Sequence, residues 1–231
     1  MTGQTEPLDY RRLITSTAAT LVIFWLCLFV PAGSLVWLRG WLFFAVAVAA
    51  GIVLSVYLRR VNPEIFAARV NRHTGTKSWD KWIVALLIVV MTSVIPVAAL
   101  DDGHYHWSVV PWWVVGTGHA SFLVGMAGMA WAEAVNKFFE PTVRIQTDRG
   151  HHVIDTGPYA IVRHPGYVSA VPLVVGMGFA LGSYWALIPA ALCCLILIVR
   201  TVLEDRTLQA ELPGYREYAQ RVRYRLMPGV W

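Results

Sequence analysis

The chain has 231 residues, of which 57% are hydrophobic and only 14% are charged, and this balance excludes an ordinary soluble domain. Its formal net charge is +5, but no RNA- or DNA-reading motif accompanies that charge. We therefore expect the basic residues to face anionic lipid, and we expect no nucleic-acid partner.

Long uncharged stretches predict membrane-spanning helices, because about 20 helical residues cross a bilayer core. Five stretches carry no Lys, Arg, Asp or Glu: Leu13 to Leu38, Gly40 to Leu58, Trp82 to Leu100, Trp107 to Ala132, and Val168 to Val199. The first is interpreted as a retained helix, since it is longer than the apolar region of a signal peptide and no convincing cleavage site follows it.

The last stretch is too long for one straight span, because its helix would measure roughly 48 Å. Gly182 and Ser183 lie at its midpoint, so we expect two short helices folded back on each other. Pro172 and Pro189 would then be tolerated as kinks. The predicted fold is an all-α, polytopic transmembrane bundle of about six spans that ends in this short helical hairpin, followed by a C-terminal helix.

Basic residues predict the orientation of the bundle. With the N-terminus inside, 18 of the 19 Lys and Arg residues fall in inner segments, and only Arg39 falls outside. The predicted outer loop between the third and fourth spans carries Asp101 and Asp102. Both termini and the polar segments beside them are therefore expected to be cytoplasmic.

Several residues inside the spans are interpreted as packing groups. Cys27, Cys193 and Cys194 show no metal-ligand spacing, and His119 is expected to form a hydrogen bond between helices. The glycine pairs follow no strand, so they indicate close helix packing and do not support a Rossmann domain. These pairs are Gly116 with Gly118 and Gly176 with Gly178.

Two polar segments are large enough to build a chemical site, Asn136 to Tyr167 and Arg200 to the C-terminus. Neither can form a core of its own, so they must pack on each other and on the helix ends. Arg200 and Glu204 share a helix face at i and i+4, where opposite charges can lie side by side. A third inner segment, Arg59 to Lys81, is predicted to be a surface connection with an Asn62-Pro63 turn and a short helix.

The motifs in these segments occur in a characteristic order. Gly157-Pro158-Tyr159 precedes Arg163-His164-Pro165-Gly166-Tyr167, the hairpin and the Arg200-x-x-x-Glu204 pair. Tyr215-x-x-Tyr218 and Arg225-Leu-Met-Pro228 then follow. This order, with the Asn62-Pro63-Glu64 loop, resembles bacterial members of the isoprenylcysteine carboxyl methyltransferase family, most strongly from Asn136 to Trp231.

The resemblance implies one integral membrane methyltransferase domain over residues 1–231. Residues 1–133 would form four N-terminal spans, and residues 134–231 would form the cofactor-binding and catalytic core. It also implies S-adenosylmethionine as cofactor, a bacterial inner membrane as location, and a lipophilic or prenylated acceptor.

Carried over by motif, the resemblance assigns a catalytic role to Arg200 and Glu204, with Arg200 holding the substrate. It assigns cofactor contacts to Gln146, His151, His152, Val153, Ile154, Tyr159, His164, Pro165, Gly166, Tyr167 and Glu204. Such a cofactor needs an apolar slot for adenine, polar groups for ribose and negative potential for its cations. Val153, Ile154, the tyrosines and Glu204 can supply them.

Other assignments stay open on the sequence alone. Three nearby histidines are compatible with a metal, but His151 and His152 are adjacent and no ligand triad joins them, so no metal is expected. The favoured acceptor is a carboxylate such as that of an isoprenylcysteine, with a lipid or a small thiol as alternatives. A membrane NADPH-dependent reductase and a transporter remain competing readings, although the spans carry few polar residues to line a path.

Overall fold

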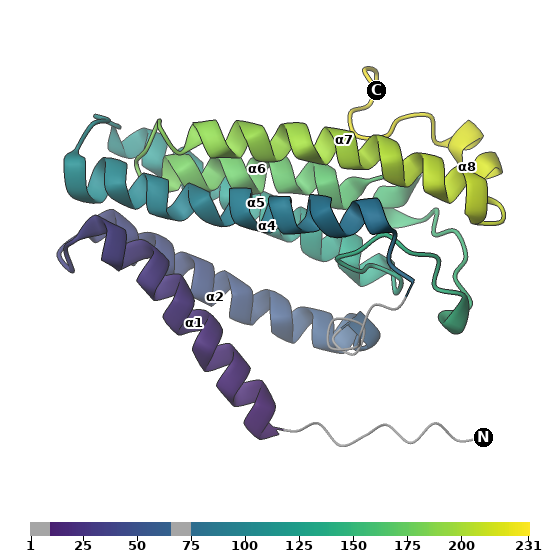
Figure 1. Ribbon diagram of the computed structural model, residues 1–231, viewed down its shortest axis with the longest axis horizontal. Helices are drawn as coiled ribbons and strands as arrows, with labels where there is room; N and C mark the ends of the chain where they lie inside the picture. Colours follow the sequence, from purple (N-terminus) through teal and green to yellow (C-terminus); the bar gives the residue numbers. More distant parts are fainter. Residues whose placement is uncertain (1–9, 66–74) are drawn as a thin grey trace.

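The computed structural model describes residues 10–65 and 75–231, with side chains from Thr15 onward. Within these ranges the chain forms seven α-helices and no strand (Figure 1). The helices are α1 (Tyr10–Ala32), α2 (Leu38–Val61), α4 (Ser78–Ala98), α5 (Trp112–Val135), α6 (Pro165–Ala180), α7 (Leu187–Glu211) and α8 (Tyr215–Arg221). A π-helical segment, η1 (Ala99–Tyr105), continues α4, and the short 3-10 helices η2 (Thr147–Arg149) and η3 (Gly157–Ala160) lie between α5 and α6.

Four segments are long and apolar enough to cross a membrane: Thr15–Ala32, Leu38–Val61, Ser78–Tyr105 and Leu187–Glu211. The all-α prediction is therefore confirmed, and these four helices match four of the six predicted spans. Helix α6 is apolar but has only 16 residues, and α5 occupies the position of the remaining predicted span.

The predicted hairpin is right in its turn and wrong in its second arm. Gly182, with a φ of +77°, ends α6 at the predicted midpoint, where a residue without a Cβ favours the left-handed conformation. Helix α7 is not short, because its 25 residues run without interruption past Arg200 and Glu204 to Glu211. Pro189 lies in the first turn of α7, where the backbone N–H that it lacks would have no helical partner, so it produces no kink.

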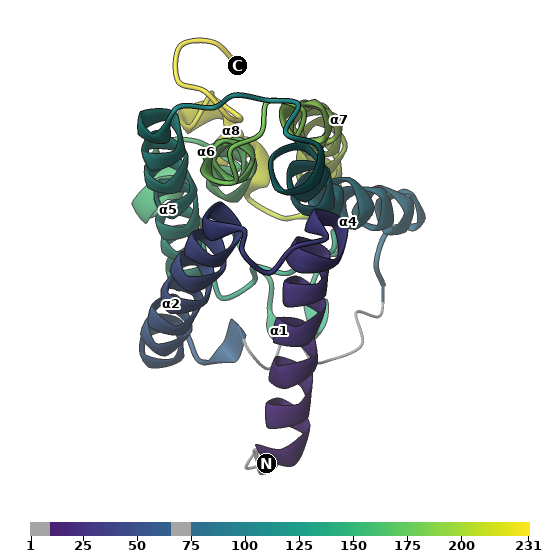
Figure 2. The same cartoon turned by 90° about the vertical axis from the view of Figure 1, so that its left-hand side faces the viewer.

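Helices α5 and α6 pack closely because glycines bring their backbones together, and Figure 2 shows the two helices side by side. A Cβ at Gly125 would lie 2.5 Å from the backbone nitrogen of Leu173, and one at Gly176 would lie 2.5 Å from that of Phe122. Gly118 faces the backbone of α6 in the same way. The packing role predicted for Gly118 and Gly176 is confirmed, and we call this contact between α5 and α6 the glycine seam.

Two packing predictions are wrong in detail. Gly116 is exposed, and a Cβ there would meet nothing within 4 Å, so it is not a packing glycine. His119 places its Nδ1 2.9 Å from the carbonyl oxygen of Val115 in its own helix, and it makes no hydrogen bond to another described helix. Its ring instead lies 6.1 Å from the ring of Phe43 in α2.

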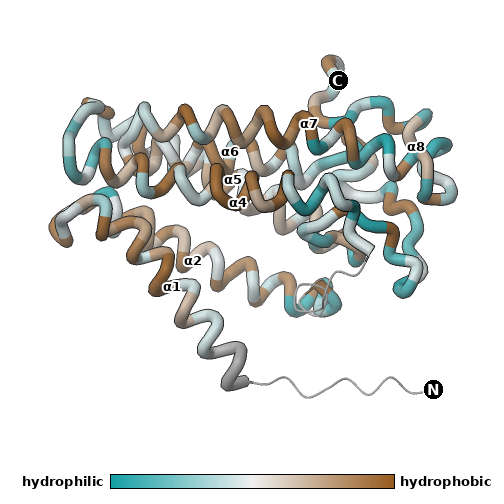
Figure 3. Tube along the Cα trace, viewed as in Figure 1, coloured by the Kyte–Doolittle hydropathy of each residue, from teal (hydrophilic) through white to brown (hydrophobic). Residues whose placement is uncertain are grey.

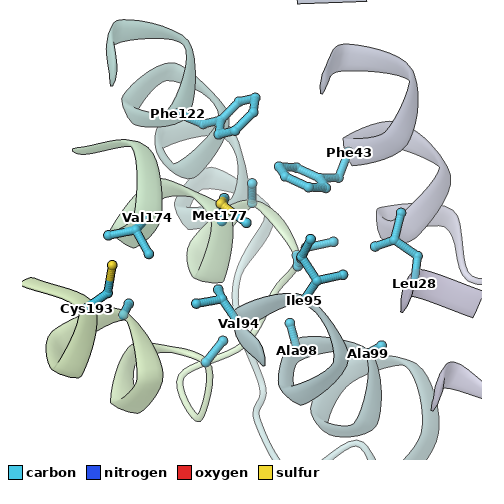
Figure 4. Close-up of a cluster of buried hydrophobic side chains, with 14 of the residues drawn as sticks. Leu28, Phe43, Val94, Ile95, Ala98, Ala99, Phe122, Val174, Met177 and Cys193 are labelled. Atoms are coloured by element: carbon cyan, nitrogen blue, oxygen red, sulfur yellow. The ribbon is translucent and has the colours of Figure 1, made fainter. Parts of the chain in front are cut away.

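One hydrophobic core joins the six long helices (Figure 4). Its buried members include Leu28 of α1, Phe43 of α2, Val94 of α4, Phe122 of α5, Val174 of α6 and Cys193 of α7. Toward its first residues α1 leans away from this core (Figure 1). The polar segments therefore have a single apolar scaffold on which to assemble.

The two ends of the bundle differ in character. The loop before α6 and helix α8 form a hydrophilic end, whereas hydrophobic residues dominate the helices (Figure 3). Arg39, the predicted outside residue, lies at the opposite end and forms an ion pair with Asp102. Asp101 does not lie in a loop as predicted, since η1 extends the helix to Tyr105 and buries Asp101 completely.

The predicted surface connection after α2 is only partly within the described residues. Asn62 and Ile65 are buried, and the Asn62 side-chain amide donates a hydrogen bond of 2.7 Å to the carbonyl oxygen of Glu133 in α5. This turn therefore packs on the bundle instead of lying on its surface. Residues 66–74 of the segment from Arg59 to Lys81, in which a short helix was predicted, lie outside the described residues.

Candidate active site

A cavity of about 520 Å³ lies at the hydrophilic end of the bundle and is within the usual size of small-molecule sites. Residues from α4, α5, α6, α7, α8 and the loop between α5 and α6 line it. All twelve residues that the sequence suggested for the site are among them: Gln146, His151, His152, Val153, Ile154, Tyr159, His164, Pro165, Gly166, Tyr167, Arg200 and Glu204. Three chain segments that are distant in sequence therefore converge on one cavity.

Aromatic rings form one wall of the cavity. Phe138 is buried, and its ring centre lies 4.6 Å from that of His151 and 4.9 Å from that of His152. Burial, with a smaller contribution from His152, lowers the pKa of His151 to about 4, so its imidazole is neutral near pH 7. The wall therefore offers flat ring surfaces, which suit a planar ring such as adenine.

Gln146 uses its side-chain amide for hydrogen bonds within the loop. Its Nε2 donates a hydrogen bond of 2.7 Å to the carbonyl oxygen of Phe138, and its Oε1 accepts one of 2.8 Å from Arg149. The side chain is almost fully buried. Gln146 thus fixes the aromatic wall, and both ends of its amide already have partners in the protein.

Tyr159 is held from two sides. Its hydroxyl accepts a hydrogen bond of 3.1 Å from the Asn136 side chain, and its carbonyl oxygen accepts one of 2.8 Å from the hydroxyl of Tyr218. Burial raises the pKa of Tyr159, so the phenol stays protonated. Tyr218, the second residue of the Tyr-x-x-Tyr motif, thereby anchors the loop that carries Gly157-Pro158-Tyr159.

Asp205 holds together residues of the cavity-lining loop and of the C-terminal segment. The sequence interpretation missed it. Its carboxylate is completely buried and accepts hydrogen bonds from Arg163 at 2.8 and 3.1 Å and from Arg225 at 2.9 Å. The hydroxyl of Tyr215 donates another at 3.1 Å. The Arg163, Tyr215 and Arg225 motif positions are thus joined by one acidic residue of α7.

His164 lies beside this cluster at the start of α6. Its ring stacks on that of Tyr167, with centres 5.6 Å apart and planes only 1° from parallel. Its Nε2 is buried 3.5 Å from the Asp205 carboxylate, and its geometry gives no hydrogen bond to the described residues. His164 Nε2 is therefore a buried polar atom without a hydrogen-bond partner among the described residues, next to the Asp205 carboxylate.

Arg200 and Glu204 share a helix face, as predicted, but each forms its hydrogen bonds with another helix. Arg200 binds the carboxylate of Asp80 in α4 through Nε at 2.9 Å and Nη2 at 3.2 Å. Glu204 accepts a hydrogen bond from the hydroxyl of Tyr167 in α6. The side-by-side pairing of Arg200 with Glu204 suggested by their spacing is therefore replaced by two separate interactions between helices.

Together these residues can hold a ligand with a flat ring and a positive charge. Phe138 and the two adjacent histidines provide ring surfaces, Val153 and Ile154 provide apolar contact, and Glu204 provides a carboxylate. S-adenosylmethionine has this combination of groups, so the residues fit it. Asp80 and Asp205 were not among the predicted site residues, because no motif connects them to the loop. Asn136 and Phe138 were also missed, although both lie in the polar segment Asn136 to Tyr167.

Residues 119–210 match the isoprenylcysteine carboxyl methyltransferase (ICMT) family. The matched range begins within α5 and ends near the last residue of α7, so it contains every predicted site residue. The resemblance drawn from the motifs is thereby confirmed over this range. No curated protein matches the chain.

Proposed function

Because residues 119–210 match the isoprenylcysteine carboxyl methyltransferase family, we propose that this membrane protein is an S-adenosylmethionine-dependent methyltransferase that acts on a lipophilic acceptor. The observation that supports this most is the lining of the cavity. We call the part lined by polar residues of the loop before α6 the polar compartment, and the part lined by apolar residues of α4, α6 and α7 the apolar groove.

The polar compartment suits the cofactor. When bound, S-adenosylmethionine supplies an electrophilic methyl group on a sulfonium, which becomes a neutral thioether as the methyl moves to the acceptor. The Glu204 carboxylate, oriented by Tyr167, would lie near the positive charge of the cofactor, and the neutral His151 adds no repulsion. An ionised acceptor needs no general base, so the residues contribute mainly by alignment and by excluding water.

The apolar groove suits the acceptor. Val84, Leu87, Ile88 and Met91 line it from one face of α4, because they are spaced three or four residues apart. Ile88 is 56% exposed and Met91 is 42% exposed, so this wall also borders the region that lipid would occupy. Ala170, Val174, Cys193 and Leu197 line the groove from α6 and α7. A prenyl or acyl chain could lie there with its head group near Arg200.

The favoured acceptor is a carboxylate of the isoprenylcysteine type, in keeping with the family. Methylation of a lipid or of a small thiol is the alternative, because the groove selects for apolar character and not for one head group. The distribution of basic residues supports placing the site on the cytoplasmic face of the membrane. The resemblance of the Asn62-Pro63-Glu64 loop to bacterial members of the family favours a bacterial inner membrane.

The pairing of arginines argues against the competing reductase. A nicotinamide dinucleotide carries several phosphate charges and requires free cationic side chains. Arg144 pairs with Glu140 and Asp148. Arg163 pairs with Asp205, and Arg200 pairs with Asp80. Each arginine that lines the cavity thus has a carboxylate of the protein as its partner, which favours a ligand without phosphate.

Calorimetry on the purified protein tests the proposal. S-adenosylhomocysteine, the demethylated product of the cofactor, should bind and raise the melting temperature, whereas NADPH should do neither. The Glu204→Gln variant should show the same fold but weaker binding. Binding of NADPH in preference to S-adenosylhomocysteine would refute the methyltransferase. Transfer of a labelled methyl group to candidate lipophilic acids, lipids and thiols would then identify the acceptor.

A further inference from the structure

We propose that Asp80 is a positioning residue that orients Arg200 toward an anionic oxygen of the acceptor. Asp80 lies in the first turn of α4, 120 residues before Arg200 in the sequence, and it belongs to no motif in the chain. The inference rests on the proposed function, since it concerns how that site would recognise its acceptor.

The contact between the two residues is buried and has a fixed orientation. The Asp80 side chain is completely inaccessible, and that of Arg200 is 8% exposed. Asp80 accepts hydrogen bonds from both Nε and Nη2, so the carboxylate and the guanidinium are held by two parallel contacts. Nη2 also donates a hydrogen bond of 2.6 Å to the carbonyl oxygen of Pro141. Rotation of the guanidinium would break all three interactions.

Further contacts connect this pair to both parts of the cavity. Asp80 also accepts a hydrogen bond of 2.6 Å from the backbone N–H of Val143, which lies in the loop that lines the cavity. The guanidinium carbon of Arg200 lies 5.5 Å from the centre of the Tyr167 ring, and Tyr167 in turn binds Glu204. Asp80 therefore connects the start of α4 directly to the loop. Through Arg200 and Tyr167 it is also connected to Glu204, the carboxylate proposed to bind the cofactor.

The remaining nitrogen of Arg200 is available to a ligand. None of the described residues accepts a hydrogen bond from Nη1, although Nε and Nη2 are both engaged. Among the described residues, the buried side-chain polar atoms without a hydrogen-bond partner are His119 Nε2 and His164 Nε2. Nη1 of Arg200 has no partner either and is not one of these buried atoms, so it retains accessible surface. Because Arg200 lines the cavity, Nη1 is the group that can donate to an acceptor oxygen.

This arrangement changes what Arg200 can contribute. Asp80 balances its charge, so the arginine acts less as a free positive charge and more as a donor with a set direction. An acceptor oxygen on Nη1 would then be placed by the same contacts that hold Asp80. Without Asp80, the guanidinium could turn toward Glu204, its neighbour one helical turn away, and withdraw from the acceptor.

Binding of a matched pair of probes tests this role without requiring turnover. N-acetyl-S-farnesylcysteine and its methyl ester share an apolar chain but differ in the carboxylate. Their affinities are measured by calorimetry on protein saturated with S-adenosylhomocysteine. Wild-type protein should prefer the acid about 10-fold or more, because only the acid offers a charged oxygen to Arg200. Asp80→Asn should lose this preference while its affinity for S-adenosylhomocysteine changes less than about 3-fold, since Glu204 keeps its carboxylate and its hydrogen bond from Tyr167.

A matched control separates positioning from general stability. Asp101 is also completely buried and accepts several hydrogen bonds, but it lies at the far end of the same helical segment. Asp101→Asn should keep the preference for the acid even where it lowers the melting temperature. If Asp80→Asn does not fold, Asp80→Glu keeps the charge but moves it by one methylene, and it should reduce the preference only in part.

The possible failures are distinguishable. If wild-type protein does not bind S-adenosylhomocysteine, the proposed function fails and the inference fails with it. If it binds S-adenosylhomocysteine but does not prefer the acid, the inference alone is wrong. An unchanged preference in the folded Asp80 variants, or an equal loss of preference in Asp101→Asn, would also overturn the positioning role.

Discussion

The hydroxyl of Tyr167, in the first turn of α6, donates a hydrogen bond to the carboxylate of Glu204 in α7. This contact joins the last residue of the His164-Pro165-Gly166-Tyr167 motif to the last residue of the Arg200-x-x-x-Glu204 motif. The two motifs are separated in the sequence by the whole helical hairpin, yet they meet at one side of the cavity. Their juxtaposition gives the proposed cofactor site an oriented negative charge.

Glu204→Gln should weaken binding of S-adenosylhomocysteine by about 1.5 to 3 kcal/mol, as expected for the loss of one charge-assisted hydrogen bond. Tyr167→Phe should have a smaller effect, because it leaves the carboxylate in place and removes only the group that orients it. Calorimetry on both variants, with melting curves as a control for folding, measures the difference. Equal losses of affinity in the two variants would argue that Tyr167 contacts the ligand itself.

Arg200→Ala should destabilise the protein by about 3 to 5 kcal/mol, because it leaves the buried Asp80 carboxylate without its cationic partner. Asp80→Asn combined with Arg200→Gln should be less destabilised than the sum of the two single substitutions. Unfolding in mixed detergent provides the free energies, and strict additivity would show that the two residues do not interact in solution.

The partners of Arg200 illustrate what the sequence could and could not predict. The spacing of Arg200 and Glu204 correctly placed both on one helix face, and the motif order correctly placed the loop, Tyr167 and Glu204 around one cavity. Asp80 could not be found in this way, because it comes from a different helix 120 residues earlier. Asp205 was missed for the same reason, since its partners Arg163 and Arg225 are distant along the chain.

Among the helices, length and charge predicted where most spans lie, but helix ends depended on tertiary contacts. Asp101 was assigned to a loop because a charge usually ends an apolar span. In the folded protein it accepts hydrogen bonds from Ser108 and Ser183, so the helical segment can continue to Tyr105 with the carboxylate buried. Hydropathy alone does not reveal such a partner.

Gly118→Ala should destabilise the bundle by about 1 to 3 kcal/mol, because the new methyl group would overlap the backbone of α6. Gly116→Ala is a matched control two residues earlier on the same helix, where a Cβ meets nothing within 4 Å. It should leave stability unchanged or raise it by up to about 1 kcal/mol, as alanine favours helix over glycine. Similar destabilisation by both substitutions would contradict the observed packing of α5 on α6.

His151 should make the folded protein less stable in acid. Its pKa is about 4 in the folded protein against an ordinary value of 6.5, so the unfolded chain takes up a proton first as the pH falls. The free energy of unfolding should therefore decrease from about pH 7 toward pH 4. Below about pH 4 this group should cause no further decrease. His151→Gln should show a smaller fall in melting temperature between pH 7 and pH 5 than wild type. An identical fall in both proteins would show that His151 does not titrate in this way.

In the proposed orientation the cavity faces the cytoplasm. Two variants, each with one cysteine introduced at an opposite end of the bundle, can test this orientation. Asp148 lies in the loop before α6, and Val109 is 89% exposed at the other end. In intact cells a membrane-impermeant maleimide should label Val109→Cys, whereas Asp148→Cys should react only after permeabilisation. The wild-type protein controls for Cys27, Cys193 and Cys194. The reverse labelling pattern would invert the proposed topology.

The glycine seam between α5 and α6 also determines which wall of the cavity can give way to a bulky ligand. Separating α5 from α6 would break backbone-level contacts along their length, so we expect these two helices to stay together when a ligand enters. Helix α4 is different, since fully buried aspartates, Asp80 and Asp101, fix its segment near both ends while the groove-lining residues lie between them. We therefore expect a long apolar chain to enter by bending the middle of α4 outward, while the two ends of its segment stay in place.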